Sequence, residues 1–389
     1  MKGHIRERST GRWAIVLDLR DPGTGMRRRK WHSLRGTKRD SQNECHRLLA
    51  EMNAGSYIEP SKVTLGQFLE RWLEHQKPLL SPRSAERYSD LVRKNIVPFL
   101  GAVPLTQLQP MQISAAYSKA LESGRRDGAG GLSASTVRYM HAVLHRALGQ
   151  AVLWNMLQRN PAHVVKAPKI ERRQMKALDE SQMADLLARF RPTRMFVPVL
   201  LGAMCGLRRG EIAALRWKSI DLAGARMAIT ESAEQTSAGV RMKETKSGHG
   251  RAIALPSIVV EELRRYRLRQ VQELLRLGVH AADDTLVVLR EDGESLQPST
   301  LSHRFVELLA ASPELPRIRF HDLRHSHATH LLTSGVHPKV AQERLGHSTI
   351  GITLDLYSHV LPGMQEDAAA KVDAGIRAAI ERGAKKGVG

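Results

Sequence analysis

The stretch "GLRRGEIAALRW", residues 206–217, places two arginines and one acid at the start of an apolar helical pattern. Glu211 continues into the helix, whereas Arg208 and Arg209 stand at its entrance. An arginine at this position opposes the helix dipole, which predicts an anionic group nearby to compensate it. Glu211, solvent and an external anion all remain open as that compensating partner.

The stretch "RMKETKSGHGRAIALP", residues 241–256, predicts two strands joined by a glycine-rich turn. The strands are expected over 240–244 and 251–255, which places Lys246 beside the "SGHG" turn. A surface lysine is the default interpretation of such a residue. No local feature distinguishes Lys246 from Lys243.

Four histidines crowd the stretch "RFHDLRHSHATHLLTSG", residues 319–335. Asp322 is expected to cap a helix that ends at the closing glycine, so that His321 and Arg324 project to the same side. His321 and His325 also have the i, i+4 spacing of metal ligands. The glutamate that accompanies the two-histidine helical zinc pattern is missing, so a metal site is disfavoured.

A single tyrosine stands in "LGHSTIGITLDLYSHV", residues 345–360. The preceding helix is predicted to begin at Pro338 and to stop at Gly346, which leaves His347 in a turn. Tyr357 shares one face of the next helix with two apolar residues, Ile350 and Leu354. Taken alone, this pattern favours a core aromatic over a nucleophile.

The composition indicates a polyanionic partner. The 389 residues include 60 Lys and Arg against 39 Asp and Glu, a net charge of +21. Nucleic acid or a membrane surface is expected, because each neutralised phosphate releases counterions. No secretory signal is predicted, and no apolar run reaches the ~18 residues of a membrane span. Two distant cysteines, Cys45 and Cys205, disfavour a disulfide framework and indicate a reducing compartment where nucleic acid is found.

Residues 12–19 and 26–34 alternate as two strands around a "DPGTG" turn, and a helix is expected from Thr37 onward. This predicts a small sheet covered by one helix. Seven basic residues and no acid lie between Pro22 and Arg39, either as a solvated face or as a ribbon laid against DNA. They are Arg27, Arg28, Arg29, Lys30, Arg35, Lys38 and Arg39.

Residues 64–165 have an almost entirely helical pattern. Ser81 before Pro82 and Ser133 before an apolar stripe predict helix starts, in a compact domain of four or five helices. The basic side chains available for phosphates are Arg83, Arg87, Arg93, Lys94, Arg138, His141 and His145. No catalytic constellation occurs in this part. Asp179 and Gln182, with capping-box spacing, then open the third unit.

Taken together, the polar groups of the third unit fit phosphodiester chemistry. Arginine forks stabilise charge on non-bridging phosphate oxygens. A tyrosine hydroxyl can form a covalent phosphoester if nearby cations favour its ionisation, and a lysine or histidine can protonate the leaving 5′ oxygen. Two arginines, one lysine, two histidines and one tyrosine suffice without a metal.

These motifs resemble the tyrosine recombinase, or phage integrase, family, most specifically in "GLRRGEIAALRW", "HDLRHSHATHLL" and "LGHSTIGITLDLYSH". The resemblance implies that Arg208 and Arg324 clamp the scissile phosphate. It also implies that Lys246 is the general acid and that Tyr357 is the nucleophile. Two histidines would position groups and move protons, namely His321 and His347. Glu211 would support the first arginine. His327 departs from the family, which often has an apolar residue there.

The resemblance further implies a multidomain α+β protein. Residues 1–58 would form a small β-sheet with one helix that binds arm-type DNA sites, and residues 62–165 an all-α core-binding domain. Residues 175–389 would form a mixed, mainly α catalytic domain with a small sheet and a C-terminal helix. A cytoplasmic, bacterial site-specific recombinase is expected, which integrates or excises a prophage or another mobile element through a 3′-phosphotyrosyl link.

The implied partners are double-stranded attachment-site DNA and further copies of the chain, with a monomer in solution and a tetramer on DNA. DNA-bending or excisionase accessory proteins are compatible with this, whereas a nucleotide cofactor, a metal and a membrane are not expected. The tail, residues 364–386, has an apolar stripe on an otherwise charged helix. This helix either folds back on its own domain or, as the resemblance implies, docks on a neighbouring protomer. A type IB topoisomerase-like enzyme and a catalytically idle architectural DNA-binding protein are the alternatives.

Overall fold

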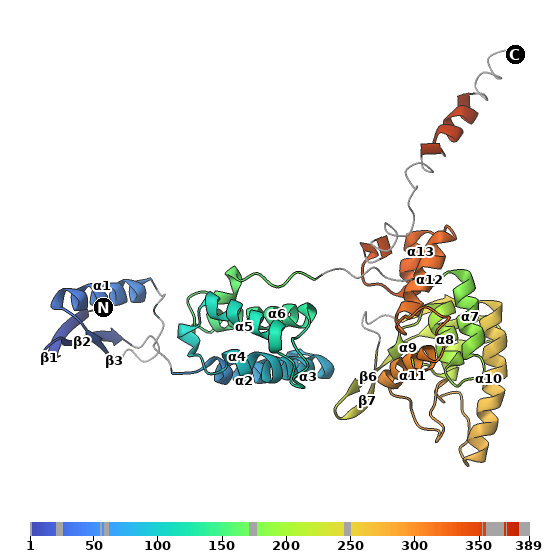
Figure 1. The fold of residues 1–389 in the computed structure, drawn as a ribbon, viewed down its shortest axis with the longest axis horizontal. Helices are drawn as coiled ribbons and strands as arrows, with labels where there is room; N and C mark the ends of the chain where they lie inside the picture. The colour runs from blue at the N-terminus through green and yellow to red at the C-terminus, as the bar shows by residue number, and fades with distance from the viewer. Residues whose placement is uncertain are drawn as a thin grey trace. The chain divides into compact units, whose positions relative to one another are not determined.

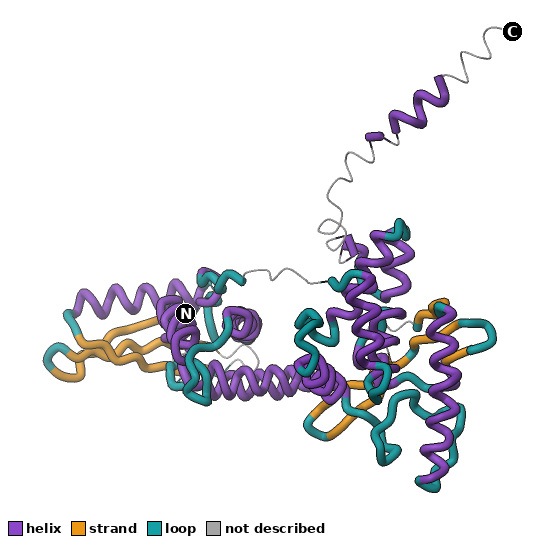
Figure 2. The backbone as a smooth tube through the Cα atoms, turned by 45° about the vertical axis from the view of Figure 1, so that its right-hand side comes forward, coloured by secondary structure: helices purple, strands orange, loops and turns teal. Residues whose placement is uncertain are grey.

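The computed structural model describes residues 2–20, 26–54, 57, 62–170, 177–244, 250–351, 353–354, 369–370 and 372–380. The chain divides into two compact units, Met1–Glu171 and Arg172–Gly389. Helices predominate, with small antiparallel sheets in both units (Figures 1 and 2). The expected α+β class is therefore confirmed.

The first unit begins with an antiparallel sheet of order β1-β2-β3 that is followed by one helix. Its elements are β1 (Lys2–Ser9), β2 (Arg12–Arg20), β3 (Arg27–Arg35) and α1 (Lys38–Asn53). Two strands and the helix were expected. β1 was not, because Ile5 alone among its residues packs on the apolar cluster. Ile15 and Leu17 of β2 pack on the apolar side of α1, which gives this sheet its own small core.

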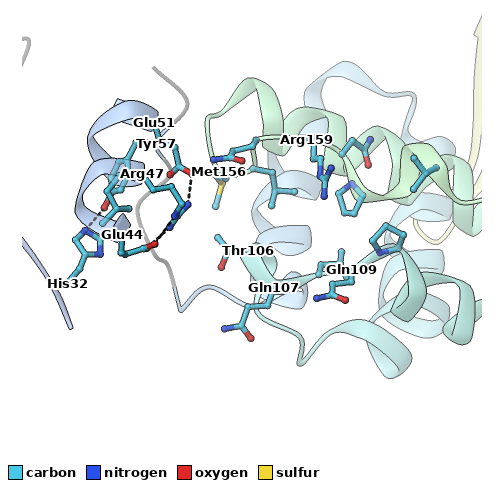
Figure 3. Close-up of a pocket in the computed structure, with 18 residues that line it drawn as sticks. His32, Glu44, Arg47, Glu51, Tyr57, Thr106, Gln107, Gln109, Met156 and Arg159 are labelled. Carbon is cyan, nitrogen blue, oxygen red and sulfur yellow. Dashed lines mark hydrogen bonds and ion pairs between the residues drawn. The ribbon is translucent and has the colours of Figure 1, made fainter. Parts of the chain in front are cut away.

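Local polar contacts fix α1. Thr37 and Asp40 close a capping box at its start, as the expected helix position requires. Figure 3 shows Arg47 between two acids of the same helix, with Nη2 2.5 Å from Oε1 of Glu44 and an ion pair to Glu51. These are exposed i, i+3 and i, i+4 pairs, which stabilise a helix by about 0.2–0.5 kcal/mol each.

The helical part of the first unit has a core separate from that of the sheet. It contains α2 (Leu65–Gln76), η1 (Lys77–Leu79), α3 (Pro82–Leu91), η2 (Val92–Ile96), α4 (Val97–Leu100), η3 (Leu105–Gln107), α5 (Pro110–Ser123), α6 (Ala134–Leu153) and η4 (Pro161–Val164). Ser81 and Ser133 cap α3 and α6 through backbone N–H groups three residues on, as predicted. Phe68 and Trp72 of α2 lie fully buried beneath these helices.

The second unit combines helices with two small sheets. Its helices are α7 (Glu180–Phe190), α8 (Phe196–Cys205), α9 (Arg209–Ala214), η5 (Trp217–Ser219), α10 (Ser257–Arg276), α11 (Pro298–Ala310), α12 (Asp322–Thr333) and α13 (Pro338–Leu345). Its strands are β4 (Ile220–Asp221), β5 (Arg226–Ile229), β6 (Glu231–Thr236), β7 (Gly239–Glu244) and β8 (Arg251–Ala254). The capping box of Asp179 and Gln182 opens α7 as expected.

The expected pairing of residues 240–244 with 251–255 is wrong, although both segments are strands. β7 pairs with β6, and β8 pairs with β5 in a sheet of order β4-β5-β8. A two-residue loop joins β6 to β7, so little loop entropy is lost when these strands pair. Gly239, directly after the loop, has a positive φ of 119°, which glycine adopts without steric cost. β8 instead sets Ile253 opposite Met227, which buries both against the main core.

The apolar helix α8 organises the second unit. Most of its residues are buried, and it packs against α7, α9, α10 and α12. Gly206 ends it with a left-handed φ of 66°, and the chain turns there into α9. Arg208 therefore follows directly on this buried helix, and its side chain is partly exposed. Among the described residues, every helix is too short or too polar to cross a membrane.

Candidate active site

Arg208 is the N-cap residue of α9, and Glu211 is the compensating anion that the sequence left open. The Arg208 backbone N–H donates to Oε2 of Glu211 over 2.9 Å, and Nη1 donates to Oε1 over 2.7 Å. Nη2 donates to the carbonyl of Gly346 over 2.7 Å. The Arg208 side chain nevertheless remains 39% exposed, so it is held in place while one side stays open to an external anion.

Glu211 carries its charge inside the protein, where it is only 3% exposed. Burial by itself raises the pKa of this carboxyl. Hydrogen bonds and charge from Arg251, together with Arg208, outweigh burial and hold the pKa at about 2. Glu211 is therefore an anion at neutral pH and supports two arginines.

Arg324 lies 2% exposed on α12. Its Nη1 donates to the carbonyl of Gly206 and its Nη2 to that of Leu345, each over 2.5 Å. Burial, followed by the charge of Arg208, lowers the pKa of Arg324 to about 9, which still leaves it charged at neutral pH. Arg208 and Arg324, more than a hundred positions apart in sequence, thus bond to adjacent carbonyls at the end of α13.

Three histidines surround these arginines. His321 precedes α12, and its ring meets that of His325 edge to face with centroids 4.8 Å apart. His347 follows Gly346, and its Nδ1 lies 2.9 Å from Oγ1 of the buried Thr353. Loss of water contact and the nearby arginines lower the pKa of His347 to about 4.

His321 is the N-cap residue of α12 and is exposed by surface area. Desolvation, then His325 and Arg324, lower the pKa of His321 to about 4. Both ring systems, His321 and His347, are therefore neutral at pH 7. Neutral imidazoles can accept one proton and donate another, which suits proton transfer.

The expectation that Asp322 caps α12 is wrong. Its carboxylate accepts from the backbone N–H and the side chain of Arg319, just before the helix, and not from the first backbone amides of α12. His327 is buried, and its Nε2 accepts from Nε of Arg344 over 3.1 Å. Across the described residues, no group of three His, Cys, Asp or Glu side chains is arranged to hold a metal.

Tyr357 and Lys246 lie outside the described residues. The competing lysine, Lys243, lies on β7 and pairs with Glu234 at 2.5 Å between Nζ and Oε1. Ile350 and Leu354, which the sequence places on the face of Tyr357, are 40% and 43% exposed.

The basic residues expected to bind DNA have varied surroundings. Arg35, Lys38, Arg39 and Arg138 are exposed, and the side chains of Arg27 and Arg28 lie outside the described residues. Arg29 pairs with Asp18 over 3.0 Å, and Lys30 lies over the ring of Tyr57.

In the helical part, Arg83 pairs with Glu86 over 3.3 Å, whereas Arg87 lies 4.3 Å from the ring centre of Tyr139. Arg93 and Lys94 each pair with an acid, Glu70 and Asp90 respectively.

Arg251 is the site residue that the sequence analysis missed. It starts β8 and donates from both terminal nitrogens to Glu211, over 2.9 and 2.8 Å. The sequence held a signal for Arg251, because Arg251, Ile253 and Leu255 are spaced by two and so share one face of the strand, and the two apolar residues are buried. An arginine on the apolar face of a strand needs an acid partner inside the protein.

The family model of the phage integrase family matches residues 176–363, and that of the phage integrase N-terminal SAM-like domain matches residues 64–121. A protein of Caldanaerobacter subterraneus subsp. tengcongensis named "Tyrosine recombinase XerC-like" is 25% identical over 357 residues, covering 85% of this chain and 88% of that one.

Solved structures share the fold. The Tn1549 transposon integrase in complex with a circular intermediate DNA is 18% identical with a TM-score of 0.68, covering 80% of this chain and 99% of that one. A lambda integrase tetramer bound to a Holliday junction is 20% identical with a TM-score of 0.59, covering 90% and 94%. The chain therefore belongs to the phage integrase family of tyrosine recombinases, which are enzymes of site-specific DNA recombination.

Proposed function

We propose that this recombinase integrates or excises a mobile element by cutting one DNA strand at a time through a phosphotyrosyl intermediate. One observation carries the proposal: Arg208 and Arg324 bond to the adjacent carbonyls of Gly346 and Leu345, directly before His347. Two guanidinium groups fixed at one helix end can neutralise the two non-bridging oxygens of one phosphate.

In the proposed reaction, the Oη of Tyr357 attacks the scissile phosphorus and loses its proton to a neutral histidine. The bond from phosphorus to the 5′ oxygen breaks, and Lys246 donates a proton to that leaving oxygen. The product is a 3′-phosphotyrosyl link and a free 5′ hydroxyl. Attack by the 5′ hydroxyl of a partner strand reverses the same steps and releases Tyr357.

His321 and His347 are proposed to accept the tyrosine proton: a pKa of about 4 keeps both rings neutral at pH 7, and the negative charge of a bound phosphate would raise that pKa and strengthen them as bases. A charged imidazolium beside two arginines would add repulsion and could not accept the tyrosine proton. Arg324, with a pKa of about 9, remains cationic under the same conditions. The site would thus combine permanent positive charge with neutral proton carriers.

The first unit is proposed to hold DNA away from the cleavage position. In the β1-β2-β3 sheet, Ile15 and Leu17 pack on the side of α1, so alternate residues point to the opposite face. Cross-strand pairing puts Arg12 beside Arg35 on that face, and Trp31 there is 53% exposed. An exposed aromatic among arginines supports binding to a DNA groove.

Assembly on DNA is proposed to use the tail. Val372, Ile376 and Ile380 are 62%, 56% and 65% exposed, as expected of a stripe that docks on a neighbouring protomer. Each fully buried side chain would contribute about 2 kcal/mol, too little for a stable complex in free solution. A monomer that becomes a tetramer on paired attachment sites, in the cytoplasm and with DNA-bending or excisionase accessory proteins, fits this weak contact.

Incubation of the protein with its element's own attachment-site DNA tests the proposal. We expect a covalent adduct that resists denaturation, and no adduct from Tyr357→Phe, which keeps the ring and should still fold and bind DNA. The adduct should form equally in EDTA. An adduct from Tyr357→Phe would remove this residue from the reaction, and loss on chelation with recovery on added zinc would favour a metal site in the histidine-rich segment.

A further inference from the structure

Arg251 uses all three nitrogens of its guanidinium inside the protein. Nη1 and Nη2 donate to the two oxygens of Glu211 over 2.9 and 2.8 Å, the parallel two-bond arrangement that fixes both planes. Nε donates to the carbonyl of Arg344 over 2.9 Å. The side chain is only 13% exposed. All three nitrogens of Arg251 thus donate to protein acceptors, whereas Arg324 bonds through its two terminal nitrogens and the Arg208 side chain stays 39% exposed.

The end of α13 binds three arginines in order. The consecutive carbonyls of residues 344, 345 and 346 accept from Arg251, Arg324 and Arg208 respectively. The last carbonyls of a helix lack partners within the helix and carry the negative end of its dipole, so they attract cations. Arg251 is the member of this set that binds both carboxylate oxygens of Glu211 through its two terminal nitrogens.

The guanidinium of Arg251 packs closely against the backbone of Gly346. Gly346 ends α13 with a φ of 66°, and a Cβ on this residue would lie 2.9 Å from Nη1 of Arg251. A side chain at residue 346 would therefore press on the guanidinium of Arg251. A shift of Arg251 would be transmitted both to Glu211 and to the turn that carries His347.

We propose that Arg251 is a positioning residue of the phosphate site, which orients Arg208 through Glu211 and the end of α13 without touching DNA. The inference rests on the proposed phosphate role of Arg208. Without Arg251, Glu211 would have to be neutralised by Arg208 alone. Arg208 would then turn its fork toward Glu211 and away from the phosphate.

Single-turnover adduct formation on a nicked core-site duplex measures the effect. We expect Arg251→Gln to lower the rate roughly 30-fold, less than the ~10²-fold typical of losing a direct oxyanion donor. DNA affinity should change less than about twofold, because the lost group makes no phosphate contact. Arg251→Lys should recover part of the rate. Arg216→Gln is the matched control, because Arg216 likewise forms ion pairs with acids, Glu231 at 3.2 Å and Asp284 at 2.9 Å, but outside the site.

A double-mutant cycle with Glu211→Gln separates positioning from direct action. If Arg251 acts through Glu211, Arg251→Gln should slow Glu211→Gln far less than it slows the wild type. Equal slowing in both backgrounds, or a loss of affinity as large as the loss of rate, would overturn the proposal. Thermal unfolding of every variant checks that the rates belong to folded protein.

The pH dependence gives a readout that lost stability alone would not move. Arg251 keeps Glu211 ionised, so Arg251→Gln should lose cleavage activity at a higher pH than the wild type as the solution is acidified. Glu211→Gln should show no such displacement, because an amide does not titrate. An unchanged acid limb in Arg251→Gln would count against the proposal.

A measurement without DNA keeps this inference separate from the proposed function. Wild-type protein that forms no adduct would refute the recombination chemistry. The hold of Arg251 on Glu211 can still be followed as unfolding stability against pH. Stability from Glu211 is present above its ordinary pKa of 4.5 and is lost as the pH falls toward its folded value of about 2. Arg251→Gln should shrink this change, and an equal change in both proteins would overturn the inference.

Discussion

The arginines of the second unit and those of the N-terminal sheet differ in what surrounds them. Arg324 is 2% exposed and bonds to two carbonyls, while Arg251 uses every nitrogen on protein acceptors. On and after β3, by contrast, Arg35 and Arg39 are exposed. Both groups supply positive charge to a DNA-binding protein, but Arg324 and Arg251 are held by acceptors inside the protein, whereas Arg35 and Arg39 lie at the surface.

The difference separates two uses of the same side chain. Fixed forks are suited to charge that develops at one point in a reaction, because they need no reorganisation when the transition state forms. Burial has a cost, visible in the pKa of Arg324, which falls to about 9. Exposed arginines provide attraction that is strong, sequence-independent and weakened by salt.

Replacing a fixed fork by a point charge should have the largest effect. Arg208→Lys and Arg324→Lys keep the charge but cannot bridge two acceptors, so we expect adduct formation to fall by about 10²-fold or more. Arg209→Lys is the matched control, because Arg209 is the exposed neighbour that contacts Ser302. Near-wild-type rates for either replacement would show that positive charge alone is sufficient and that the fixed guanidinium geometry is not needed.

Removing the N-terminal sheet with its exposed arginines should lower recombination but leave cleavage nearly unchanged. Without residues 1–58, cleavage of a short core-site duplex should stay within about threefold, whereas recombination of a full-length site should fail. The sequence supplies seven basic residues between Pro22 and Arg39, and each phosphate neutralised contributes about −0.9 to the slope of log affinity against log salt. A salt slope unchanged by the deletion would show that this segment does not bind DNA.

Truncation of the tail tests whether assembly depends on a weak apolar contact. Removing residues 364–389 should lower recombination by roughly tenfold or more and leave DNA affinity nearly unchanged, because linked weak contacts act through effective concentration. A milder variant, Ile376→Ser, should act in the same direction. Synaptic complexes that form at the full rate after truncation would show that the tail packs within its own chain or has no role in assembly.

Acid should destabilise the second unit through His327, with the smallest effect of the series. Burial and then Arg344 lower the pKa of His327 to about 3, so the folded protein stays neutral where the unfolded chain gains a proton below about 6.5. Stability is therefore lost as the pH falls below 6.5. His327→Gln keeps an acceptor for Arg344 and should reduce the loss between pH 7 and 5.5 by about 1 kcal/mol. Equal curves for His327→Gln and wild type would contradict the assignment.

Much of the fold could be predicted because its boundaries depend on neighbours in sequence. The starts of α3, α6 and α7 follow from Ser81, Ser133 and Asp179, each of which bonds to a backbone N–H three residues later. Pro338 and Gly346 likewise mark the ends of α13. β1 escaped prediction, because its one core residue, Ile5, makes no alternating pattern.

The sequence by itself determined the helix limits, the excess of positive charge and the supply of arginines, histidines and a tyrosine suited to phosphate chemistry. The tertiary structure decided which strands pair, which acid Arg208 shares with Arg251, and which carbonyls orient Arg324. The physical reason is range. A cap is satisfied within one turn of chain, whereas a buried charge must find its partner wherever packing brings one, as Arg324 finds the carbonyl of Gly206.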